Sequence, residues 1–162
     1  MQPLIARFRS ARYAPMICLA LAFISLAFLE VSITWLNFRG RFAWQVISGS
    51  LLLTLLLYQW VLFFKRAFSG MRLGAGDLVT HRWVGVASTY LFALHAVRMG
   101  HFWMTALSLC FFLLALTGVL TRQVLGFRQN WLYLLWLTVH IGLAAAMIPL
   151  IAVHVWVALA FE

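Results

Sequence analysis

Acidic residues are almost absent from this chain of 162 residues, which contains 3 Asp or Glu against 12 Lys or Arg. Charged residues make up 9% of the sequence and hydrophobic residues 65%. A soluble domain is usually about half apolar and about a quarter charged. The composition therefore excludes a disordered chain and an ordinary soluble enzyme, and it indicates an integral membrane protein.

Cysteine is also scarce, because Cys18 and Cys110 are the only two, and both lie inside apolar runs. A disulfide scaffold is therefore excluded. The net charge of +9 is high, but the basic residues fall between the apolar runs. Topology signals and contacts with the membrane surface explain such a pattern. We therefore expect no nucleic acid among the partners.

Apolar runs of the length that crosses a bilayer, about 20 residues, occur five times. They cover residues 15–36, 46–64, 81–99, 102–121 and 131–160. The first run follows a basic N-terminus as in a signal peptide, but it is longer than a signal sequence and lacks a clear small-residue cleavage site. We therefore expect a retained helix. The sequence predicts an all-α membrane bundle in which residues 1–162 form a single transmembrane domain.

Basic residues are distributed unevenly between the two sides of the membrane that these runs define. With the N-terminus inside, nine lie on the inner side: Arg7, Arg9, Arg12, Lys65, Arg66, Arg72, Arg82, Arg122 and Arg128. Three lie outside: Arg39, Arg41 and Arg98. Because basic loops stay in the cytoplasm, we expect a cytoplasmic N-terminus and an outer C-terminus in a bacterial inner membrane. Tryptophans near the ends of the runs fit an interfacial belt: Trp35, Trp44, Trp60, Trp83, Trp103, Trp131 and Trp156.

The histidines show a repeated spacing. His95 follows His81 by 14 residues, and His154 follows His140 by 14 residues. At about 100° per residue, 14 residues of helix fall about 40° short of four turns, so both members of a pair share one helix face about 21 Å apart. Ionisable residues inside a membrane span are costly, and they usually mark a functional site.

The third and fifth runs cross in the same direction, because one run lies between them. We therefore expect His81 at the depth of His140 near the inner surface, and His95 at the depth of His154 near the outer surface. Two bis-imidazole sites at two depths predict two b-type hemes. Zinc fits poorly, because it prefers about four clustered ligands and no Cys or carboxylate stands near either pair.

Four glycines lie on the histidine-bearing runs or on their neighbours. Gly85 and Gly142 follow His81 and His140 closely in the sequence and leave room for a flat macrocycle. Close helix packing explains a membrane glycine equally well. The same two interpretations apply to Gly49 and Gly118 on the neighbouring runs.

Several charged or polar residues have open roles. Arg82 at the inner level and Arg98 at the outer level are candidate partners of heme propionates, since a guanidinium matches carboxylate geometry. Anchoring at the inner surface explains Arg82 equally well. His101 falls in the outer turn, as an interfacial residue or a proton relay. Glu30, the carboxylate inside the first run, is a candidate proton or quinone group or the partner of a nearby arginine.

The segment His81-Arg-Trp-Val-Gly85, leading to Leu94-His95, resembles the third helix of the ferric-reductase-like transmembrane domain, and Val139-His140 and Val153-His154 resemble its fifth. That family includes ferric reductases, NADPH oxidase cores and the heme-binding membrane subunit of the methionine sulfoxide reductase system. The resemblance covers about residues 46–158 and rests on histidine spacing and helix order. It implies a four-helix heme core over 46–158. The cytochrome b of quinol-oxidising complexes uses similar paired spacings.

The chain also departs from that family. The ferric-reductase-like domain usually has six helices against five runs here, and no GxGxxG fingerprint of a nicotinamide domain is present. We therefore expect a quinol or another protein as electron donor. The chain is then an electron-transfer subunit of a redox complex with two heme b cofactors, not a complete enzyme. Two alternatives stay open: a heme-free anchor or assembly subunit, and a small transporter or proton channel, which predicts internal repeats or broken helices.

Overall fold

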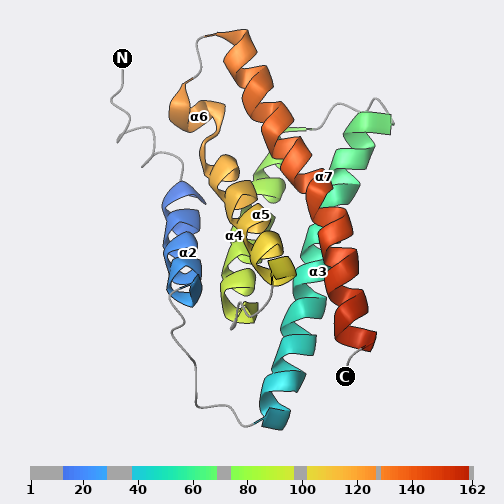
Figure 1. Ribbon diagram of the computed structural model, residues 1–162. Helices are drawn as coiled ribbons and strands as arrows, with labels where there is room; N and C mark the ends of the chain where they lie inside the picture. The colour runs from blue at the N-terminus through green and yellow to red at the C-terminus, as the bar shows by residue number, and fades with distance from the viewer. Residues whose placement is uncertain (1–12, 29–37, 69–73, 97–101, 127–128, 161–162) are drawn as a thin grey trace. The chain divides into compact units, whose positions relative to one another are not determined.

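Helices account for all the regular structure in the described part of the chain. The computed structural model describes residues 13–28, 38–68, 74–96, 102–126 and 129–160. The helices there are α2 (Tyr13–Phe28), α3 (Phe38–Phe68), α4 (Ala75–His95), α5 (Phe102–Val119), α6 (Arg122–Leu125) and α7 (Asn130–Ala160) (Figure 1). The predicted all-helical class is confirmed for these residues, which contain no strand.

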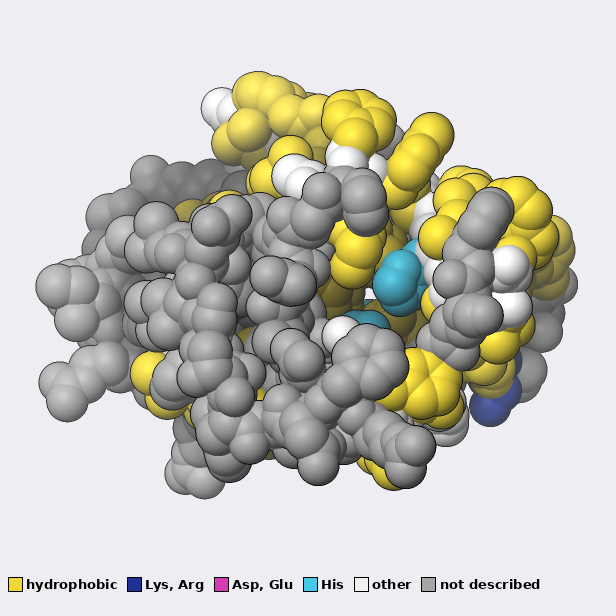
Figure 2. All heavy atoms as spheres, turned by 60° about the horizontal axis from the view of Figure 1, so that its bottom comes forward, with side chains coloured by type: hydrophobic (Ala, Val, Ile, Leu, Met, Phe, Trp, Pro, Cys, Tyr) yellow, Lys and Arg dark blue, Asp and Glu magenta, His cyan; other side chains and the backbone are white. Residues whose placement is uncertain are grey.

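Among the described residues, three helices are long and apolar enough to cross a membrane: α5, α7 and the part of α3 from Phe42 to Lys65. Helix α4 has 21 residues but includes Asp77, His81 and Arg82, which make it more polar. Helix α2 is described over 16 residues. The membrane character is therefore seen in three helices, while crossings by α2 and α4 stay predictions. Hydrophobic side chains predominate in the coloured part of Figure 2.

Two helices begin before the apolar runs that predicted them. Helix α3 begins at Phe38, so the basic segment 38–41 forms its first turn instead of a loop. Helix α4 begins at Ala75, and Asp77 in its first turn accepts a hydrogen bond from the backbone N–H of Gly74 at 2.8 Å. Backbone hydrogen bonds build a helix through polar residues as well as apolar ones. An apolar run marks only the part suited to lipid.

The helices belong to two compact units, which are described separately below. In the α3–α4 unit (Leu19–Val97), α3 packs along α4. In the α5–α7 unit (Met1–Cys18 with Arg98–Glu162), α5 packs along α7. The histidine pair of α4 and the histidine pair of α7 therefore belong to different units.

The connections in the α5–α7 unit are short and hydrogen-bonded. The hydroxyls of Tyr13 and Thr121 lie 2.7 Å apart, which ties the start of α2 to the segment after α5. Gly126 ends α6 with a φ of 61°, a left-handed conformation that glycine adopts at no steric cost. The Tyr13–Thr121 contact therefore holds the start of α2 against the segment that follows α5.

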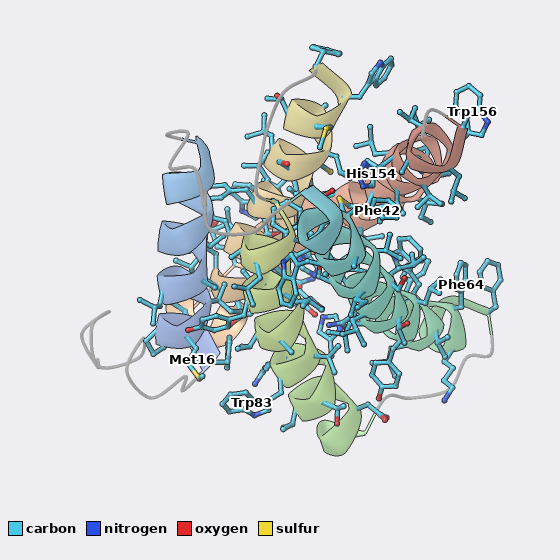
Figure 3. The ribbon with its side chains drawn as sticks, turned by 90° about the horizontal axis from the view of Figure 1, so that it is seen from below. Met16, Phe42, Phe64, Trp83, His154 and Trp156 are labelled. Atoms are coloured by element: carbon cyan, nitrogen blue, oxygen red, sulfur yellow. The ribbon has the colours of Figure 1, made fainter. Side chains whose placement is uncertain are left out.

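Helix α7 runs from Asn130 to Ala160 without interruption, and Pro149 lies inside it. Its two outermost tryptophans, Trp131 and Trp156, are exposed near its two ends. In Figure 3 Trp156 projects away from α7, and Trp83 projects away from α4. Exposed aromatic side chains at the ends of a helix, as in α7, are typical of membrane interfaces. The interfacial belt of tryptophans stays a prediction.

Candidate functional site

His95 is the last residue of α4 and lies against α3. Its Nδ1 is 3.1 Å from the hydroxyl oxygen of Ser48, a side chain with 1% exposure. The Ser48 hydroxyl donates its proton to the backbone oxygen of Trp44 at 2.6 Å. A hydroxyl has a single proton, so toward the imidazole it acts as an acceptor. The contact fits a neutral His95 with the hydrogen on Nδ1 and the lone pair on Nε2.

The position of this imidazole depends on Gly49. A Cβ added at Gly49 would lie 2.9 Å from Cε1 of His95, which is closer than real Cβ contacts. Trp44 fixes the same end of α4, because its indole N–H donates to the backbone oxygen of Leu94 at 3.1 Å. Of the two interpretations of Gly49, close packing therefore fits, and the packed group is the imidazole.

His140 has a matching environment in the α5–α7 unit. Its Nδ1 is 2.8 Å from the hydroxyl oxygen of Thr117 on α5. That hydroxyl donates its proton to the backbone oxygen of Leu114 at 2.8 Å. This contact likewise fits a neutral His140 with the hydrogen on Nδ1 and the lone pair on Nε2.

A tryptophan also supports His140. Trp136 lies one turn earlier on α7, and its ring stacks on the imidazole with centroids 5.7 Å apart and an interplanar angle of 14°. The Trp136 indole N–H donates to the backbone oxygen of Thr117 at 2.9 Å. A Cβ added at Gly118 would lie 3.9 Å from Cε1 of His140, an ordinary contact distance.

His81 and His154 are both half-buried, on α4 and α7 respectively. The side-chain N–H of Gln59 donates to the backbone oxygen of His81 at 2.9 Å, which ties α3 to α4 near this histidine. The other end of the amide, Oε1 of Gln59, is buried without a hydrogen-bond partner among the described residues. Figure 3 labels His154 on α7. The roles of His81 and His154 as ligands stay predictions.

The remaining predicted site residues differ in what surrounds them. A Cβ at Gly85 would meet Nε2 of Gln59 at 3.7 Å, and a Cβ at Gly142 would meet no described atom within 4 Å. Close packing therefore does not require a glycine at either position. Arg82 is half-buried, next to His81 in the sequence. Three predicted residues lie outside the described part of the chain: Arg98, His101 and Glu30.

The described residues offer few metal-ligating side chains close to one another. No three His, Cys, Asp or Glu side chains come together there in a way that would hold a metal ion. A heme needs only axial ligands from the protein, because the porphyrin nitrogens supply the rest. A neutral imidazole with the lone pair on Nε2 is of the type that binds heme iron. That His95 and His140 bind heme stays a prediction.

The sequence analysis did not identify the three side chains that hold the imidazoles: Ser48, Thr117 and Trp136. The sequence did contain a clue to the two hydroxyl residues, because Ser48 directly precedes Gly49 and Thr117 directly precedes Gly118. Trp136 lies four residues before His140, a spacing at which side chains on a helix are neighbours.

Comparison of the chain with protein-family models, with characterised proteins and with solved structures returned no match. The resemblance to the ferric-reductase-like domain, which rests on histidine spacing and helix order, therefore stays a prediction.

Proposed function

We propose that this chain is a membrane di-heme b-type cytochrome that passes single electrons across the bilayer. The donor is a quinol or another protein, and the acceptor is a protein or a small molecule. The observation that carries the proposal is the hydroxyl–imidazole hydrogen bond found in each unit. Histidines that bind metals usually donate their other ring N–H to an acceptor, which fixes the ring and raises its basicity.

The proposed ligand pairs follow from the direction of the helices. In the predicted topology α4 and α7 cross in the same direction, because α5 crosses between them. His81 and His140 then form the inner pair, and His95 and His154 form the outer pair. Since 14 residues of helix span about 21 Å, the two centres divide the membrane thickness into shorter transfer steps.

The chain's own residues hold and insulate these centres. A bound heme supplies the one-electron Fe(III)/Fe(II) couple. The imidazoles supply the axial nitrogens, and the apolar helix faces exclude water and lower the local dielectric constant. Gly85 and Gly142 leave room for a flat macrocycle, which is supported by the open space around Gly142. Arg82 and Arg98 are the proposed partners of the propionates.

We place the chain in a bacterial inner membrane, with the N-terminus inside and the C-terminus outside. Three apolar helices and exposed tryptophans at the ends of α7 support contact with lipid. The excess of basic residues in the predicted inner segments supports this orientation. The proposed partners are other redox subunits or electron carriers, with quinone as a candidate small molecule.

Electron transfer across a sealed vesicle tests this function directly. Vesicles that contain the purified chain are loaded with ferricyanide, dithionite is added outside, and the loss of ferricyanide absorbance is followed. The wild-type chain is expected to bleach ferricyanide at least about tenfold faster than empty vesicles. His140→Ala and His95→Ala each remove one proposed centre and leave a gap of about 21 Å. Because electron transfer slows steeply with distance, each variant is expected to bleach ferricyanide at nearly the rate of empty vesicles.

His101→Ala is the matched control, because it removes the one histidine outside the proposed pairs. It is expected to bleach ferricyanide at the wild-type rate. Wild-type vesicles that bleach no faster than empty ones would contradict the proposal. Equal rates in the wild type and in both ligand variants would contradict it as well.

A further inference from the structure

The same arrangement of a hydroxyl and a histidine occurs once in each unit. Ser48 provides the hydroxyl in the α3–α4 unit, and Thr117 provides it in the α5–α7 unit. Each hydroxyl donates to a backbone oxygen of its own helix and lies within hydrogen-bond distance of Nδ1 of a histidine on the packed helix, which fits a hydrogen bond donated by Nδ1–H. Each directly precedes a glycine whose added Cβ would approach Cε1 of that histidine. Two independent occurrences indicate that the hydroxyl serves the imidazole and not only its own helix.

The two histidines lie in different halves of their helices. His95 is the last residue of α4, whereas His140 lies in the first half of α7. If α4 and α7 cross the membrane in the same direction, these positions face opposite surfaces. The hydroxyl-bonded histidines then fall in different ligand pairs, His95 in the outer pair and His140 in the inner pair.

A hydrogen bond at Nδ1 changes the electron donation from Nε2. When Nδ1–H is bonded to an acceptor, the imidazole becomes a more basic ligand, which favours the ferric over the ferrous state. The hydroxyl is a stronger acceptor because it is itself a donor to a carbonyl, and hydrogen bonds in a chain polarise one another. The effect of each hydroxyl is therefore a lower midpoint potential at its own heme.

We propose that Ser48 and Thr117 are positioning residues that each orient one axial histidine and lower the potential of one heme, Ser48 at the outer centre and Thr117 at the inner centre. This inference rests on the proposed di-heme function. It adds that the two potentials are set separately, by one hydroxyl in each unit.

The test is a redox titration of the full-length chain, followed by heme absorbance. Ser48→Ala is expected to shift one of two redox waves to higher potential and to leave the other in place. Thr117→Val, which keeps the shape of the side chain, is expected to shift the other wave. Ser48→Thr and Thr117→Ser retain the hydroxyl and are expected to restore the wild-type waves.

Thr54→Val is the matched control. The Thr54 hydroxyl donates to the backbone oxygen of Ser50 on the same helix at 2.9 Å, so its removal takes away a similar bond and no imidazole contact. It is expected to leave both waves unchanged. Loss of one heme in Ser48→Ala, with two hemes kept in Ser48→Thr and Thr54→Val, also supports a positioning role.

Two outcomes would overturn the inference while the di-heme function stands. One is heme-loaded Ser48→Ala and Thr117→Val with both waves unchanged. The other is a shift of the same wave by both variants, which would place His95 and His140 at one heme. A wild-type chain without heme would instead remove the proposed function itself.

Discussion

The α3–α4 unit and the α5–α7 unit hold their histidines with the same hydrogen bond but with different packing. In the first, the imidazole of His95 fills the space left by Gly49, where an added Cβ would lie 2.9 Å away. In the second, the corresponding distance from Gly118 to His140 is 3.9 Å, and the ring is held by stacking on Trp136. Steric fit therefore positions one imidazole, and an aromatic stack positions the other.

The hydrogen bond and the packing determine different properties of the imidazole. A single bond to Nδ1 sets the tautomer but leaves the ring free to rotate about the bond direction. A second contact is needed to set the ring plane, which determines where Nε2 points. The two units meet this need differently, and the predictions below use that difference.

The largest effect is expected from Gly49→Ala. The added methyl group would push the rigid imidazole of His95 away, because the contact would be 2.9 Å. Overpacking of this kind costs about 1–3 kcal/mol. We expect a lower unfolding temperature in detergent and a loss of about one of about two hemes per chain, measured by the pyridine hemochrome assay.

Gly118→Ala is the paired variant in the other unit. Its methyl group would lie 3.9 Å from Cε1 of His140, so the fold and the heme content are expected to stay near wild type. Equal damage by both glycine variants would contradict the distinction between the two units.

A smaller effect is expected from Trp136→Leu, which removes the stack on His140 and the hydrogen bond to the backbone oxygen of Thr117. An aromatic pair contributes about 0.5–1.5 kcal/mol beyond its buried area. The expected result is a broadened spectrum of the inner heme in electron paramagnetic resonance, since the ring plane is less restricted. Trp136→Phe keeps a stacking ring and should narrow the spectrum again; a spectrum unaltered in Trp136→Leu would argue against this role.

The smallest effect is expected from Ser88→Ala. Among the described residues, two buried polar atoms have no hydrogen-bond partner, Oε1 of Gln59 and Oγ of Ser88, and both belong to the α3–α4 unit. Ser88 has 2% exposure, and its hydroxyl has no hydrogen bond there. Leaving such a group buried costs free energy, but the small cavity left by removing the hydroxyl offsets part of that gain. Ser88→Ala should therefore raise the unfolding temperature of the heme-free chain slightly.

The neighbouring Thr89 is a suitable contrast. It is equally buried, but its hydroxyl donates to the backbone oxygen of Gly85 at 2.7 Å. Thr89→Val should lower the unfolding temperature. A drop in Ser88→Ala as large as that in Thr89→Val would show that the Ser88 hydroxyl has a partner.

The helices were predictable because apolar runs and breaks are visible in the sequence, and the run at 131–160 matches α7 to within a residue at its start. The first residues of α3 and α4 were not predictable in this way. Polar residues such as Asp77 lie in the first turn of a helix, outside the apolar run that marks the rest of it. The histidine spacing was readable along each helix. The partners of the imidazoles were not readable, because they depend on which helix packs beside which.

Ser48 and Thr117 illustrate the point. Each is an ordinary hydroxyl within an apolar run, and its importance comes from a histidine that is 47 or 23 residues away in the sequence. Helical spacing relates residues on one helix, such as Trp136 and His140, but not residues on two helices. The pairing of histidines between α4 and α7 stays a prediction for the same reason.

The most direct test of the account is the heme content of the full-length chain purified in detergent with its native partners, measured by the pyridine hemochrome assay. The account predicts about two b-type hemes per chain. A chain that is folded and still bound to its partners but contains no heme would contradict it. An anchor or assembly subunit would then be the better explanation.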